Sequence, residues 1–77
     1  MNQADRKELE ALIETLGEVM GALEDKAGEL EDRAGNLDEK FPDKAETIQS
    51  EADSLNEAKD SIEDVISSIQ GAMEGGF

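Results

Sequence analysis

Four cations and one aromatic residue form the clearest chemical pattern in this 77-residue sequence. A seven-residue spacing separates Lys26, Arg33 and Lys40, and Phe41 and Lys44 lie on either side of the only proline. On a helix, this spacing places the three cations along one edge. Phenylalanine can stack on a nucleobase, and the N–H groups that begin a helix attract anions. We therefore predict a ligand site for a small nucleotide, shared between copies of the chain, at Arg33, Lys40, Phe41 and Lys44.

The same residues have a purely structural interpretation. Glu29 precedes Arg33 by one helical turn, and Glu31 and Asp38 lie on the opposite edge of the helix. Charges placed in this way commonly set the register between packed helices. In this alternative the cations bind no ligand, and Phe41 closes the end of the core.

Catalytic and metal-binding patterns are missing from the sequence. It contains no cysteine, histidine or tryptophan, so its serines have no histidine to activate them. Glu10 and Glu14 have the one-turn spacing of di-metal helical bundles, but those sites also use a Glu-x-x-His motif. We therefore predict a protein that is not an enzyme, with no catalytic residues, no metal and no cofactor.

The charge balance restricts the partners. Twenty-one acidic and seven basic residues give a formal net charge of −14, which opposes direct binding to nucleic acid or to an anionic membrane. The favoured partners are cationic surfaces, such as a basic host protein, and other copies of the chain. No apolar run approaches the roughly 18 residues of a membrane span. We expect a soluble, cytoplasmic protein.

Apolar residues recur in steps of three and four along most of the chain, as in the seam of a coiled coil. Pro42 interrupts the pattern, because proline lacks the N–H that a helix interior needs but suits the start of a new helix. Only Lys59 is polar among the seam residues. The first series is Leu9, Ile13, Leu16, Met20, Leu23, Ala27, Leu30, Ala34, Leu37 and Phe41; the second is Ala45, Ile48, Ala52, Leu55, Lys59, Ile62, Ile66, Ile69 and Met73.

These series predict an all-α fold, a two-helix antiparallel coiled-coil hairpin that forms a single domain. We expect helix one at about 4–40, a turn at about 41–42, helix two at about 43–74 and a tail at 75–77, in which Phe77 is loose.

Large and small residues should alternate across the hairpin. If the chain reverses near Pro42, Ala34 faces Ile48, and Leu30 faces Ala52. This alternation lets helices interdigitate at short distance. The glycines that follow seam residues, at Gly21, Gly28 and Gly35, are expected to assist the close approach; the alternative is that they open a ligand groove.

The apolar face widens at the end of the hairpin far from the turn. Leu12 and Val19 flank the first series, and Val65 and Ala72 flank the second. A lone hairpin would leave these side chains in water. We therefore predict a homo-oligomer, an antiparallel four-helix bundle or a higher assembly, with Leu12, Val19, Val65 and Ala72 at its interface.

The segment DEKFPDKAETIQSEADSLNEAKDSIEDVISSIQ resembles the small acidic helical-hairpin proteins, of unassigned role, that phages and prophages of Gram-positive bacteria encode. The resemblance rests on Glu39, Lys40 and Phe41 at the end of helix one and on Gln49 and Ser50 near the start of helix two. It implies a phage setting and a location in the cytoplasm of the bacterial host.

Three functions fit these features. The leading hypothesis is a non-enzymatic phage counter-defence protein that sequesters a small nucleotide immune signal or a host factor. The second is an acidic nucleic-acid mimic that occupies a DNA- or RNA-binding protein. The third is a structural coiled-coil scaffold, for which the heptads alone suffice.

Overall fold

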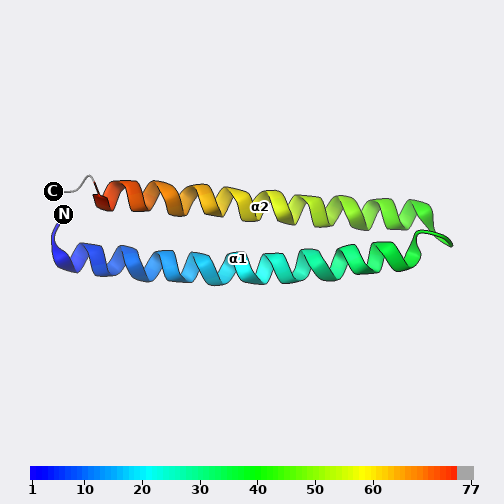
Figure 1. Ribbon diagram of the computed structural model, residues 1–77, viewed down its shortest axis with the longest axis horizontal. Helices are drawn as coiled ribbons and strands as arrows, with labels where there is room; N and C mark the ends of the chain where they lie inside the picture. Colours follow the sequence, from blue (N-terminus) through cyan, green and yellow to red (C-terminus); the bar gives the residue numbers. More distant parts are fainter. Residues whose placement is uncertain (75–77) are drawn as a thin grey trace.

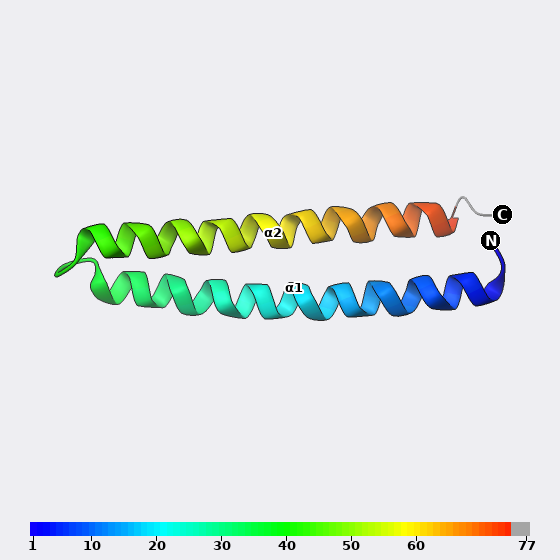
Figure 2. The ribbon, with the colours of Figure 1, turned by 180° about the vertical axis from the view of Figure 1, so that it is seen from behind.

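The computed structural model describes residues 1–74, which form two long helices folded back on each other (Figure 1). Helix α1 spans Gln3–Leu37 and helix α2 spans Pro42–Glu74. The start of α1 and the end of α2 lie at the same end of a rod with extents of 58 × 15 × 10 Å, as the reverse view also shows (Figure 2). The prediction of an all-helical hairpin is confirmed. The predicted tail at 75–77, with Phe77, lies outside the described residues.

Local sequence signals account for the helix boundaries. The Asn2 side chain accepts a hydrogen bond from the Asp5 backbone N–H at 2.8 Å, and the Asp5 carboxylate accepts one from the Asn2 N–H at 3.2 Å. This reciprocal capping box satisfies N–H groups that have no partner inside the helix. Pro42 occupies the first position of α2, where its missing N–H carries no penalty.

The turn begins earlier and is longer than the sequence suggests. Helix one is predicted to run to about residue 40, but α1 ends at Leu37, and residues 38–40 form a turn. The Phe41 N–H donates to the Leu37 carbonyl at 2.7 Å, and the Phe41 carbonyl accepts from the Ala45 N–H at 2.9 Å. Phe41 therefore belongs to the connection rather than to the core, and its side chain is 49% exposed.

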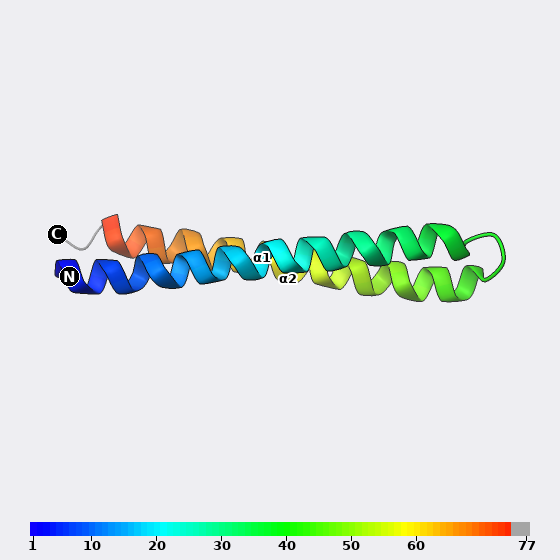
Figure 3. The same cartoon turned by 90° about the horizontal axis from the view of Figure 1, so that it is seen from below.

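The seam between the helices follows the heptad pattern. All the predicted seam residues except Phe41 are buried or half-buried, including Lys59. The most buried residues are alanines in the half of the hairpin near the turn: Ala27, Ala34, Ala45 and Ala52, each with at most 4% of its surface exposed. Their burial fits the predicted alternation of large and small residues. Seen from the edge, the two helices cross near the middle of the rod, as in a supercoil (Figure 3).

The glycines do not serve the close approach that the sequence suggests. A Cβ atom added to Gly21, Gly28 or Gly35 would meet no other atom within 4 Å. The prediction that these glycines let the two helices of the hairpin pack closely is therefore wrong, because the alanines already provide the short separation.

The open end of the hairpin has a link that the heptad pattern does not predict. The Arg6 guanidinium donates a hydrogen bond from Nη2 to the Met73 carbonyl at 3.0 Å. This contact ties the first turn of α1 to the last turn of α2, where a helix leaves carbonyl groups without partners.

Replacing a buried alanine and an exposed glycine by larger residues should change the free energy of unfolding in opposite directions. Ala52→Leu should lower the free energy of unfolding by about 1–3 kcal/mol, because Ala52 is fully buried and a larger side chain forces the helices apart. Gly21→Ala should raise it by about 0.5–1 kcal/mol, because the new methyl group meets open space and alanine favours the helix. Urea unfolding followed by circular dichroism measures both. Destabilisation by Gly21→Ala would show that this glycine is needed for packing.

Candidate functional site

The hairpin has two flanks that differ in charge. The seam consists of residue pairs such as Ala34 and Leu37. In an antiparallel pair of helices, the residue that comes after each such pair in the sequence lies on one side of the seam. The residue that comes before each pair lies on the other side of the seam. We name the first side the acidic flank and the second the apolar–basic flank. A hydrogen bond from Asn56 Nδ2 to Glu31 Oε1, at 3.2 Å, joins α2 to α1 across the acidic flank.

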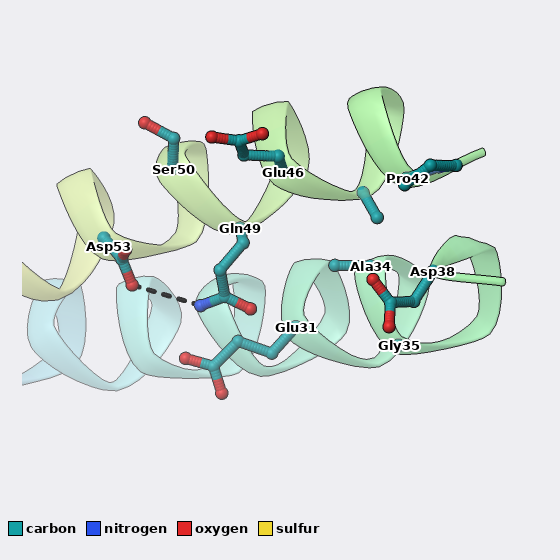
Figure 4. Close-up of a pocket in the computed structure, with 10 residues that line it drawn as sticks. Glu31, Ala34, Gly35, Asp38, Pro42, Glu46, Gln49, Ser50 and Asp53 are labelled. Atoms are coloured by element: carbon teal, nitrogen blue, oxygen red, sulfur yellow. Dashed lines mark hydrogen bonds between the residues drawn. The ribbon is translucent and has the colours of Figure 1, made fainter.

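A groove of about 700 Å³ lies on the acidic flank beside the turn (Figure 4). The small residues Ala34, Gly35 and Ala45 leave this space open between the helices. The lining contains four carboxylates and no basic side chain: Glu31 comes from α1, Asp38 from the turn that follows it, and Glu46 and Asp53 from α2. We name this feature the acidic groove.

Few internal contacts neutralise the acidic groove. The Asp53 carboxylate accepts a hydrogen bond from Gln49 Nε2 at 3.1 Å (Figure 4), and Glu31 accepts the bond from Asn56. Both donors are neutral amides. The four carboxylates therefore present a concentrated negative potential, and the small residues between them offer an apolar floor.

The residues predicted to bind a nucleotide lie elsewhere. Arg33 directly precedes a seam residue of α1, and Lys44 precedes the first seam pair of α2, so these two cations belong to the apolar–basic flank, while Lys40 lies in the turn beside Phe41. Lys44 Nζ lies 5.3 Å from the centroid of the Phe41 ring, a cation–π contact. None of Arg33, Lys40, Phe41 and Lys44 lines the acidic groove.

Lys26, the first cation of the stripe, has a partner within its own helix. Its Nζ donates to Glu29 Oε2 at 2.7 Å, and both side chains are mainly exposed. This hydrogen bond, together with the charge of Lys26, lowers the pKa of Glu29 below its usual range, and the more distant Arg33 adds a smaller effect in the same direction. Lys26 therefore contributes to the electrostatics of the helix, as the structural interpretation of the stripe suggests.

The residues predicted at an oligomer interface are solvent-exposed in the single chain. The exposed fractions are 52% for Leu12, 41% for Val19 and 48% for Val65, and Ala72 is also exposed. All four directly precede seam residues, so they lie on the apolar–basic flank, at the end away from the turn.

Two further features of the described residues bear on function. Within residues 1–74, no group of three or more acidic side chains is arranged to hold a metal ion. Neither α1 nor α2 has the length and apolar character to cross a membrane.

A ligand groove opened by the glycines was the alternative, and Gly35 does line the acidic groove, but the four carboxylates around it were not predicted. The sequence places Glu31 and Asp38 on the edge opposite the cations, and it places small residues beside them. What it does not show is that Glu46 and Asp53 of α2 close the other side, since that depends on how the two helices are rotated about their axes.

Comparisons with protein-family models, with curated proteins and with solved structures find no match for this chain. The resemblance to phage-encoded hairpins therefore stays a prediction.

The Lys26–Glu29 pair makes a prediction about titration. In wild-type protein, the pKa of the Glu29 carboxyl should lie below the ordinary value for glutamate, and Lys26→Met should return it toward that value. Because the folded pKa is depressed, any stability from the pair is present above the unfolded pKa and is lost as the pH falls through the folded pKa. Carboxyl-detected NMR titration gives both values. An unchanged Glu29 pKa in the variant would contradict the contact.

Proposed function

We propose that this chain is a non-enzymatic binding protein whose acidic flank occupies a basic surface of a partner protein, as a nucleic acid would. The acidic groove carries this proposal. It gathers carboxylates from both helices, and its lining contains no cation.

The groove suits lysine and arginine side chains in two respects. The carboxylates of Glu31, Asp38, Glu46 and Asp53 supply the charge for the basic head groups. The exposed surface of Gly35 and Pro42, which also line the groove, offers contact to the methylene stems of these side chains. A nucleic acid offers regularly spaced phosphates instead, and a rod 58 Å long with a formal net charge of −14 presents a comparable extended negative surface.

The overall charge adds attraction at longer range. Excess carboxylates steer a cationic partner toward the rod before contact, and salt screens this attraction. In a phage, such a protein would act by occupying a factor of the host cell.

The acidic groove predicts binding of a basic peptide. A synthetic nona-arginine peptide should bind the protein, and its affinity should fall as salt is raised from about 50 to about 200 mM. In the variant Glu46→Lys with Asp53→Lys, we expect at least roughly tenfold weaker binding than in a control with Glu8→Lys and Glu57→Lys, because the control changes the same net charge at exposed positions outside the groove. Isothermal titration calorimetry measures each affinity.

Equal weakening in the two variants would show that binding depends on net charge alone and would exclude the acidic groove as the site. Binding that is unchanged at high salt would contradict the charge-based recognition itself. Competition between double-stranded DNA and the protein for the peptide tests whether both present the same kind of surface.

A second candidate function, sequestration of a small nucleotide, rests on the contact between Lys44 and Phe41. The Phe41 ring is half-exposed and has a cation above it, so its other face can stack on a base while Lys40 and Lys44 meet phosphate groups. One hairpin supplies only one such end, so a full pocket requires further copies.

Nucleotide sequestration predicts ligand-induced stabilisation that depends on the cations. A panel of cyclic and linear nucleotides should include one that raises the melting temperature, and Arg33→Glu or Lys40→Glu should abolish that rise while leaving the oligomeric state intact. Differential scanning fluorimetry with native mass spectrometry measures both. Stabilisation that persists in both variants would exclude this site.

A further inference from the structure

The apolar–basic flank is the surface on which a single hairpin leaves large aliphatic side chains exposed to water. Its half near the turn carries mainly cations, together with the carboxylate of Glu51, and its half at the open end carries exposed aliphatic side chains. We propose that the open-end half binds a second copy of this chain, and that the two hairpins point in opposite directions. This inference is independent of the proposed occupation of a basic partner surface, which concerns the acidic flank. It keeps the two turns apart, so a nucleotide pocket shared between turns does not form within this dimer.

The exposed surface area of the chain is consistent with a second copy as the partner. A compact monomer of 8.3 kDa is expected to expose about 4,600 Å², whereas this chain exposes 5523 Å². The excess, roughly 900 Å², is close to the about 800 Å² that each partner buries in a standard interface. Packing against a second copy on one flank would therefore bury an area comparable to this excess.

The buried core also indicates that the hairpin gains stability by association. Its most buried residues are four alanines, and among the residues described no large side chain is fully buried. Below roughly 80 residues, oligomerisation is a common way to supplement so small a core. Leu12, Val19 and Val65 are the aliphatic side chains beside the seam that remain about half-exposed.

The spacing of these residues matches a two-fold axis. Leu12 and Val19 are seven residues apart on α1, and Val65 and Ala72 are seven apart on α2. When two copies are related by an axis perpendicular to the rod and midway between these levels, Leu12 meets the partner's Val19, and Val65 meets the partner's Ala72. Each contact then occurs twice, which is the property of a closed two-fold interface.

Charge selects this direction over the alternative. With the hairpins pointing the same way, Lys40 and Lys44 of both copies would gather at one level, and four like charges would repel. In the opposite direction, Lys26 lies seven residues beyond Val19, and it meets the partner's Asp5, seven residues before Leu12. Lys26 has three N–H donors and uses one for Glu29, so it can also bind this carboxylate.

This arrangement leaves the two turn ends free. The overlap extends from the open end of each hairpin to about the level of Lys26, so the acidic groove and the residues Arg33, Lys40 and Lys44 project beyond it at both ends of the dimer. The helical rise places the two turns about 75 Å apart.

The oligomeric state tests the surface. Sedimentation equilibrium should give a dimer of the 8.3 kDa chain, with a melting temperature that rises with protein concentration. Leu12→Glu with Val19→Glu should raise the dissociation constant by roughly a hundredfold or more, because it places carboxylates inside the interface. The control, Ala11→Glu with Ala22→Glu, adds the same charge at exposed positions away from the flank and should still form the dimer.

A wild-type monomer, or an oligomer that the Leu12 and Val19 substitutions leave intact, would overturn the proposal. If the variant unfolds, the wild-type protein still decides the question by its mass and by the concentration dependence of its melting temperature.

Energy transfer between labels at the turn tests the direction. The chain has no cysteine, so Asp43→Cys provides a single labelling position at the start of α2. A mixture of donor-labelled and acceptor-labelled protein should show weak transfer, with a distance near 75 Å from the helical rise. Near-complete transfer would place the turns side by side and would overturn the opposite orientation. The sedimentation result, in contrast, decides whether this surface forms the interface.

Discussion

The close packing of four alanines near the turn sets the separation of the two helices. Ala27, Ala34, Ala45 and Ala52 are the most buried residues of the described chain, and no large side chain shares that degree of burial. Small side chains let two helices approach closely, but they remove little apolar area from water. The turn end is therefore tightly packed, while the larger residues of the seam, such as Leu16 and Ile66, are only half-buried in the single hairpin.

The same small residues shape the acidic groove. Between Ala34 and Ala45 there is too little side-chain volume to fill the edge of the seam, so a space stays open on the acidic flank. Gly35 lines this space, and a Cβ there would meet no other atom within 4 Å. A glycine destabilises a helix by about 1 kcal/mol relative to alanine. At Gly35 this cost accompanies the absence of a side chain that would extend into the groove. Gly21 and Gly28 do not line it, and nothing in the hairpin explains them.

Charge segregation separates two kinds of surface on one thin rod. Negative groups from both helices meet on the acidic flank, whereas most of the cations near the turn lie on the other side with Phe41. Segregation of this kind gives a small protein two different surfaces without a second domain. The proposed dimer would use the open end of the apolar–basic flank, and the proposed ligands would bind near the turn. A dimer with its turns outward would display both turn ends at once.

The two helices, the reversal at Pro42 and the seam could be predicted from the sequence, because a heptad pattern marks the side of a helix that packs against a partner. The sequence also placed Leu12, Val19 and Val65 correctly outside that seam. It failed at Phe41, which continues the pattern but belongs to the turn, since α1 ends at Leu37. Only the tertiary structure showed that the glycines contact nothing across the hairpin and that carboxylates of α1 and α2 share one groove. Both depend on the separation and rotation of two helices, and periodicity along one chain does not encode these quantities.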